Sequence, residues 1–302
     1  MSWLIVAILA YFFLAISYFG DKFLLIGGIP NPKIYSFYVG ILSIFVIVFI
    51  PFGFFLPSLQ QIFISFLTGI IFLIGLYLYY SLVKEFEVSR IVPAIGGIVP
   101  ILTFFFMYIF LGGEITLSSV EVISFLSLVL GSILIVIEKA KNIFGKSFIF
   151  SIGAAFYFAI YFVLAKFVYD SISFINGFVW IRLGTFLAAL FFLFFREVRK
   201  NIFALKPKEL NFKTTGIFIG NQIMGSLGAI LQNWAVALAP LVFVAFVNSL
   251  QGVQYVFLLI FTIIFSFKFP KILKEEVSRK IIFQKIIAIL LIGGGLVLLT
   301  LK

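Results

Sequence analysis

The chain has 302 residues, of which 64% are hydrophobic and only 11% are charged, and its formal net charge is +11. A soluble domain carries about 25% charged residues, so this composition excludes that class and predicts an all-α integral membrane protein. The sequence contains neither cysteine nor histidine, which excludes disulfides, thiol nucleophiles and the usual zinc sites. We therefore expect no metal, no cofactor and no enzyme activity.

Apolar runs of about 20 residues, the length that crosses a bilayer as a helix, follow one another along the whole chain. Charged residues, proline or glycine bound each run. The first run has no basic segment before it and no convincing cleavage site, so we interpret it as a retained span. The ten predicted spans are 3–20, 34–55, 61–83, 89–111, 118–138, 148–168, 173–195, 214–234, 241–266 and 280–300.

Basic residues gather in the loops that follow the odd-numbered spans. Of the 22 Lys and Arg residues, 19 lie there, whereas Lys166 and Lys302 lie on the opposite side and Arg182 lies inside a span. By the positive-inside rule, this bias places the odd-numbered loops in the cytoplasm and both termini outside. The positive charge therefore indicates the topology of a multi-pass cell-membrane protein, and we expect no nucleic-acid partner.

The two halves of the sequence resemble each other. Residues 10–23 align with 154–167 at an offset of 144, with six identities in fourteen positions. Residues 66–82 align with 218–234 at an offset of 152, and this second offset continues through the following span. Two blocks at similar offsets indicate an internal repeat.

The repeat divides the chain into a first five-span unit, 1–141, and a second five-span unit, 142–302. Because each unit has an odd number of spans, the two units lie in opposite orientations. Inverted repeats around a central cavity are typical of transporters in which one half rocks against the other. The bare sequence thus predicts an alternating-access transporter.

Residues 79–137 resemble the repeat of the EamA-type transporters in the drug/metabolite transporter superfamily. The likeness rests on a small-residue start, a mid-span proline at Pro100 and the Leu-Gly-Gly-Glu turn at 111–114. Residues 233–257 resemble the same repeat, although Gly252 replaces the usual proline and the turn is missing from the second half. The resemblance covers essentially the whole chain. It implies ten helices in two inverted bundles, transport of a small metabolite and termini in the cytoplasm, in conflict with the loop charges.

Arg182 lies about ten residues into the seventh span, near the middle of the membrane at about 1.5 Å per residue. Polar groups at this depth usually face the bundle interior or an aqueous cavity. We predict that Arg182 contacts the substrate, and its planar fork suits a carboxylate or a phosphate. The alternative is an arginine that extends to the interface or satisfies helix carbonyls.

Side-chain amides concentrate in the eighth and ninth spans, where the first repeat has small or apolar residues. We predict substrate contacts from Asn221, Gln222, Asn248 and Gln251. Each of these amides is alternatively a hydrogen-bonding link between helices. Tyr77 lies deep in its span, and we expect it to stack on a planar substrate. Aromatic residues nearer to span ends are more often interfacial anchors.

Helix-breaking residues occur at equivalent places in the fourth and ninth spans. These residues are Pro100, Gly96, Gly97 and Gly252. Breaks at membrane depth are tolerated where they are buried in protein or line a cavity, so we predict pliable cavity walls; the alternative is a kinked packing helix. Lys22 and Lys166 occupy equivalent positions in the repeat and lie at span ends. Each lysine either anchors its helix at the membrane interface or gates the passage of a substrate anion.

No Asp or Glu lies at mid-span, and Asp21 lies at the end of the first span. This absence disfavours the carboxylate-based cation–proton exchange of small multidrug resistance proteins. We predict a permease or exporter for a neutral, zwitterionic or anionic metabolite, acting as a monomer or homodimer, with its cavity in spans 1, 3, 4, 6, 8 and 9. Two alternatives are a flippase for a lipid-linked carrier, which requires a lateral opening, and a membrane scaffold without a polar cavity.

Overall fold

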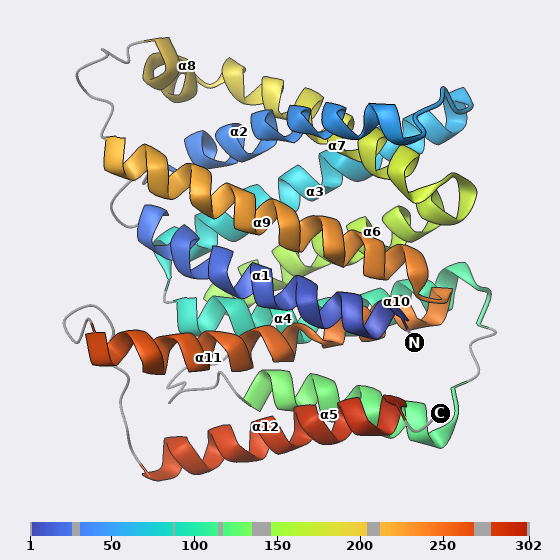
Figure 1. Cartoon of the computed structure of the whole chain (residues 1–302), viewed down its shortest axis with the longest axis vertical. Helices are drawn as coiled ribbons and strands as arrows, with labels where there is room; N and C mark the ends of the chain where they lie inside the picture. The colour runs from blue at the N-terminus through green and yellow to red at the C-terminus, as the bar shows by residue number, and fades with distance from the viewer. Residues whose placement is uncertain are drawn as a thin grey trace.

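The computed structural model is a bundle of helices, and it describes residues 2–25, 31–86, 88–113, 117–134, 146–203, 212–268 and 279–300. No strand occurs among these residues, so the predicted all-α class is confirmed. Figure 1 shows the long helices lying side by side in a stack, with both termini on the same side of the molecule. The helices are α1 (Ser2–Phe23), α2 (Pro32–Leu42), α3 (Leu59–Glu85), α4 (Val88–Phe110), α5 (Ser119–Leu134), α6 (Lys146–Ser171), α7 (Phe174–Leu190), α8 (Arg196–Phe203), α9 (Phe212–Leu238), α10 (Val244–Ser249), α11 (Gln251–Lys268) and α12 (Arg279–Thr300).

Two helix ends are formed by residues that commonly cap or terminate helices. At the start of α3, Ser58 and Gln61 form a reciprocal capping box, in which each side chain accepts from the other residue's backbone N–H. Helix α4 ends where Gly112 and Gly113 adopt positive φ angles of 65° and 84°, which glycine reaches without a steric penalty. The Leu-Gly-Gly segment is therefore a turn, at the place where the sequence predicted one.

Helix α2 continues directly into a 3₁₀ helix, η2 (Ser43–Phe52), which has ten residues. Runs of 3₁₀ helix longer than three or four residues are uncommon, because their hydrogen-bond geometry is poorer than that of an α-helix. Pro51 lies inside η2 and removes one donor. A second, shorter 3₁₀ segment, η3 (Phe191–Phe194), follows α7.

The predicted helix break at Pro100 is wrong, because α4 runs through this proline without interruption. Pro100 is buried, and α5, α6 and α10 all pack against α4 and support it. The second repeat is interrupted at the predicted place, since α10 ends at Ser249 and α11 begins at Gln251, with Leu250 between them. The two repeats therefore differ in this wall.

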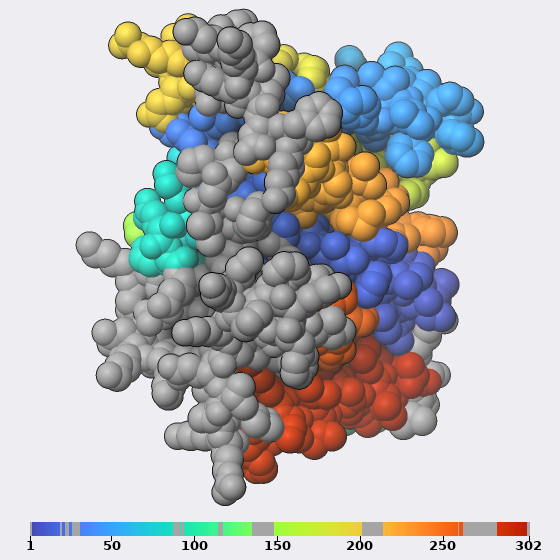
Figure 2. Space-filling view, turned by 60° about the vertical axis from the view of Figure 1, so that its left-hand side comes forward, coloured from blue at the N-terminus to red at the C-terminus, as the bar shows by residue number. Residues whose placement is uncertain are grey.

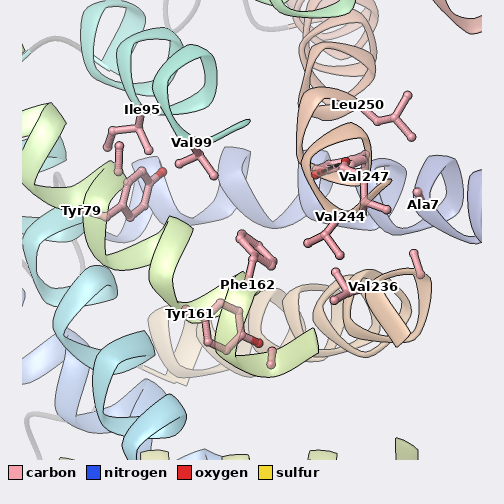
Figure 3. Close-up of a cluster of buried hydrophobic side chains, with 14 of the residues drawn as sticks. Ala7, Tyr79, Ile95, Val99, Tyr161, Phe162, Val236, Val244, Val247 and Leu250 are labelled. Carbon is pink, nitrogen blue, oxygen red and sulfur yellow. Dashed lines mark hydrogen bonds between the residues drawn. The ribbon is translucent and has the colours of Figure 1, made fainter. Parts of the chain in front are cut away.

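The helices of the two halves are interleaved. Helix α1 packs along α9 and against α11, while α6 packs along α3 and against α4. Helices α5 and α12, the last of each half, pack against each other (Figure 1). The main core lies where these groups meet, and Figure 3 shows part of it, with Tyr161 and Phe162 of α6 near Val236 of α9 and Val244 of α10.

The exterior of the molecule is apolar. Large hydrophobic side chains are exposed on many helices, and Phe45, Phe63, Phe191 and Leu290 each expose more than half of their surface. Figure 2 shows η2 and α12 at opposite ends of one face of the molecule. Among the described residues, six helical segments are long and apolar enough to cross a membrane. Extended exposed apolar surface is rare on soluble monomers, so these helices indicate a membrane protein.

Candidate functional site

A cavity of about 280 Å³ lies inside the bundle. Its walls come from α1, α3, α4, α6, α9 and α11, as expected, and also from α2 with η2 and from α7. The lining combines apolar side chains with hydroxyl, amide and charged groups, as small-molecule sites commonly do. The polar lining residues include Tyr11, Ser17, Tyr18, Asp21, Tyr79, Tyr80, Arg182, Gln222, Ser226, Gln232, Asn233, Gln251 and Gln254.

Arg182 lines the cavity from α7, as predicted. Its guanidinium carbon lies 4.8 Å from the ring centre of Phe72 and 5.0 Å from that of Phe178. Both rings offer cation–π attraction, which offsets part of the cost of holding a charge in an apolar bundle. Among the described residues the guanidinium has no hydrogen-bond or ion-pair partner, so its five N–H donors remain available to an anion.

An acidic group that we did not predict as a site residue also lines this cavity. Asp21 of α1 is 7% exposed, and it accepts hydrogen bonds from Asn221 Nδ2 at 2.7 Å and from the hydroxyl of Tyr35. Gln222 Nε2 donates to the same Tyr35 oxygen at 3.4 Å. These bonds join α1, α2 and α9. Asn221, which we predicted as a substrate contact, is a partner of Asp21 and lies outside the cavity lining.

Three tyrosines of the lining lie beside Asp21. The ring centres of Tyr18 and Tyr79 are 5.4 Å apart, and Tyr79 and Tyr80 are separated by the same distance. The structure places Tyr77 outside the lining, with its ring 5.7 Å from Phe192. Positions 77 and 79 differ by about 200° around a helix of 3.6 residues per turn, so they face opposite sides of α3.

The predicted amides divide into two groups. Gln222 and Gln251 line the cavity, together with Gln254, whose buried Nε2 finds no hydrogen-bond partner among the residues that the structure describes. Asn248 lies outside the lining and donates to Thr103 Oγ1 at 3.0 Å. It links α10 to α4, which is the helix-linking role that the sequence left open.

Asn233 is a further amide that sequence reasoning did not select. Its Oδ1 accepts from the hydroxyls of Tyr161 and Tyr169, both at 2.7 Å, and its Nδ2 donates to the Ala229 carbonyl at 2.8 Å. The two tyrosines belong to α6, so this residue fixes α6 against α9 at one side of the cavity. These three bonds leave it less capacity for a ligand than the cavity-lining Gln254 has.

The predicted glycines lie at close contacts between helices and outside the cavity lining. A Cβ atom on Gly96 would collide with the hydroxyl of Tyr255, and one on Gly97 would lie 2.6 Å from Ile133 Cγ1. A Cβ on Gly252 would likewise meet side chains of α5 and α12. Close helix packing, the alternative that the sequence left open, therefore accounts for these residues.

Lys166 also lies outside the lining. Its Nζ donates to the Ala237 carbonyl at 3.2 Å, near the end of α9, and pairs with Asp170 at 2.6 Å. A cation at a helix C-terminus satisfies a carbonyl that has no intrahelical partner and interacts favourably with the helix dipole. The side chain of Lys22, its counterpart in the repeat, lies outside the described residues.

No family model and no curated protein matches this sequence. Among solved structures, 27 chains match. One of them, a crystal structure of a protein, aligns over 98% of both chains with a TM-score of 0.65 and 15% sequence identity. At this identity the similarity concerns the fold alone, and it shows that the helical arrangement described above also occurs in another protein.

Proposed function

We propose that this protein transports a small metabolite across a membrane by alternating access, with Arg182 as the principal substrate contact. The observation that carries the proposal is a guanidinium that has no anionic partner among the described residues and lies in a partly polar cavity between interleaved helices. An anionic or zwitterionic metabolite supplies the partner that the guanidinium lacks. Gln222, Gln251 and Gln254 offer further hydrogen bonds from α9 and α11.

Ten spans in two inverted repeats form the architecture of this proposal. Each predicted apolar run is mostly helical in the described residues. The packing is reciprocal, which supports the repeat: α1 contacts α9 and α11, in the third and fourth predicted spans of the second half, while α6 contacts α3 and α4, in the third and fourth predicted spans of the first half. This exchange is what a two-fold axis in the membrane plane produces.

The proposed family is the EamA-type group of the drug/metabolite transporter superfamily, on the sequence resemblance described above. The proposed orientation places the basic loops in the cytoplasm and both termini outside. A membrane-impermeant maleimide tests this orientation in a Ser2→Cys variant, because the chain has no other cysteine. Labelling from outside intact cells is expected, and labelling only after the cytoplasm is opened contradicts the orientation.

A membrane scaffold, the alternative from another functional class, does not require a polar cavity. An unpaired arginine is costly inside a helical bundle, and groups of this kind usually mark pathways for substrates or ions. The cavity therefore favours transport over a purely structural role.

Uptake into proteoliposomes tests the transport proposal, with a panel of amino acids, nucleosides and nucleotide sugars as solutes. For the best solute, Arg182→Ala should lower uptake about tenfold or more, the effect of losing a hydrogen bond to a charged group. Arg182→Lys keeps the charge and should retain part of the activity. Arg199→Ala on α8 is the matched control, because this arginine lies outside the cavity lining. Equal uptake by Arg182→Ala and Arg199→Ala would contradict the site.

A further inference from the structure

The cavity reaches the outside of the molecule through the side of the bundle. Two of its lining residues, Phe45 of η2 and Ser226 of α9, are exposed, and Phe45 shows 67% of its surface. Both lie near the middle of their helical segments, Pro32–Phe52 and Phe212–Leu238. The opening is therefore at the depth of the bilayer core, if these segments span it.

The two walls of this opening are not in close contact. Within the described residues, neither α2 nor η2 packs closely against α9, although side chains bridge them at one end. There the rings of Tyr35 and Phe218 are 5.7 Å apart and Gln222 donates to Tyr35. Beyond this bridge, the cavity is lined by Gly225, which has no side chain, and by Ser226, which has a small one. Figure 2 shows η2 and α9 reaching the same face of the molecule.

The environment changes from apolar to charged along the path inward. Around the opening, Ile47 and Val48 of η2 and Ile223 of α9 are exposed hydrophobic residues. Inside the cavity, the guanidinium of Arg182 has no anionic partner within the part of the chain that the structure describes. A fully hydrated anion gains no binding free energy from the apolar outer part of this path. An anion with a hydrocarbon tail matches both parts, because its tail suits the apolar entrance and its charge suits Arg182.

We propose that the opening between η2 and α9 admits an anionic amphiphile from the bilayer. Its carboxylate or phosphate head binds Arg182, and its hydrocarbon tail lies between Phe45 and Ser226 and continues into the lipid. The volume of about 280 Å³ is at the low end for sites that hold drug-sized ligands, so a long tail has to remain outside. This inference rests on the proposed function, because it uses the same cavity and specifies its substrate class.

A photoreactive fatty acid tests the proposal directly. The full chain is reconstituted in phosphatidylcholine vesicles with hexadecanoate that carries a diazirine in its tail. We expect covalent labelling of the peptides that contain Phe45 and Ser226, and we expect excess hexadecyl phosphate to suppress it. Acetate and inorganic phosphate, which lack a tail, should leave the labelling unchanged. Equal competition by inorganic phosphate and hexadecyl phosphate overturns the proposal, because the ligand would then be a water-soluble anion.

Two substitutions on one helix separate the opening from the general lipid surface. Ser226→Trp fills the opening and should reduce labelling to background, whereas Leu238→Trp adds the same ring to an exposed position at the end of α9, outside the lining, and should not. Arg182→Ala should lower labelling about tenfold by removing the contact with the head group. Equal labelling of the two tryptophan variants overturns the proposal. If Ser226→Trp does not fold, the competition by hexadecyl phosphate on the wild-type protein decides.

Solute uptake in the same vesicles distinguishes failure of this inference from failure of the transport proposal. Uptake of a water-soluble metabolite without labelling at Phe45 and Ser226 overturns the lateral route and leaves transport standing. Specific labelling that hexadecyl phosphate suppresses, without movement of any amphiphile or solute across the membrane, supports the opening and overturns transport.

Discussion

Helices α3 and α7 form a closed wall of the bundle, whereas α2 with η2 and α9, their counterparts in the proposed repeat, leave a wall open. In the closed wall, Thr185 Oγ1 donates to the Gly69 carbonyl at 3.2 Å, and a Cβ on Gly184 would lie only 2.6 Å from the Phe66 Cα. The alignment offset of 152 residues places Asn221 opposite Gly69. A larger side chain at this position thus accompanies the wider separation of α9 from α2.

The residue that replaces the glycine also gives α9 a different partner. Asn221 packs against Gly20 of α1 and donates to Asp21, so α9 is held by α1 at the level where α3 is held by α7. Small residues let helices approach closely and polar ones bind them across an interface. Nearly equivalent helices can therefore build one sealed wall and one entrance, and the difference lies in a few side chains.

The largest expected effect comes from adding a methyl group to the closed wall. In Gly69→Ala, the new Cβ meets the backbone of α7 at Thr185 N, 2.5 Å away, and overpacking against backbone atoms should cost about 3 kcal/mol or more. The midpoint of thermal unfolding in detergent should fall accordingly. Gly220→Ala on α9 is the control, because nothing lies within 4 Å of its Cβ; it should be neutral or stabilising by up to about 1 kcal/mol. Similar loss in both variants would show that α3 and α7 do not depend on close approach.

An intermediate effect is expected at the bridge between α2 and α9. Tyr35→Phe removes the hydroxyl that donates to Asp21 and accepts from Gln222, a loss of about 1.5–3 kcal/mol for a bond to a charged group. Spin labels at Phe45→Cys and Ser226→Cys should then report a longer and broader distance. Tyr77→Phe makes the same chemical change where the ring contacts Phe192, and an unchanged distance is expected. A distance that is unaffected by both substitutions would mean that this bridge does not set the opening.

The smallest effect concerns the loop end of α2. Hydrogen bonds from Asn31 and Lys33 to Glu197 lower the pKa of this carboxyl below its usual value of 4.5. Because the folded pKa is the lower one, the contribution to stability is present above pH 4.5 and is lost as the pH falls through the folded pKa. Melting temperatures of wild type and Glu197→Gln should differ slightly at pH 7 and converge in acid. The pair is exposed, so high salt should also reduce the difference. A difference that persists in acid would contradict this assignment.

Depth along each helix was predictable from the sequence, and rotation about its axis was not. Counting residues from the span ends placed Arg182 at mid-depth, and it lies in the cavity. Tyr77 was chosen by the same count, although Tyr79 and Tyr80 are the residues that line the cavity. Helix α3 is apolar on every side, so its sequence has no polar stripe that shows which face turns inward.

Asp21 was missed for a different reason. It lies at the end of an apolar run, beside Lys22, and such charges ordinarily face water. In the structure α2 and α9 enclose this end of α1 and supply Tyr35 and Asn221 as donors. The partners are 14 and 200 residues away in the chain, so their approach depends on tertiary packing that local sequence does not encode.

The 3₁₀ helix η2 has a mechanical consequence for the wall that it forms. Its ten residues rise about 2.0 Å each, or about 20 Å in all, whereas the same residues rise about 15 Å as an α-helix. Rewinding η2 would therefore shorten the segment by about 5 Å and rotate every side chain along it, Phe45 included. Among the α-helices of this bundle, η2 is thus a segment whose length can change, and η2 borders the opening.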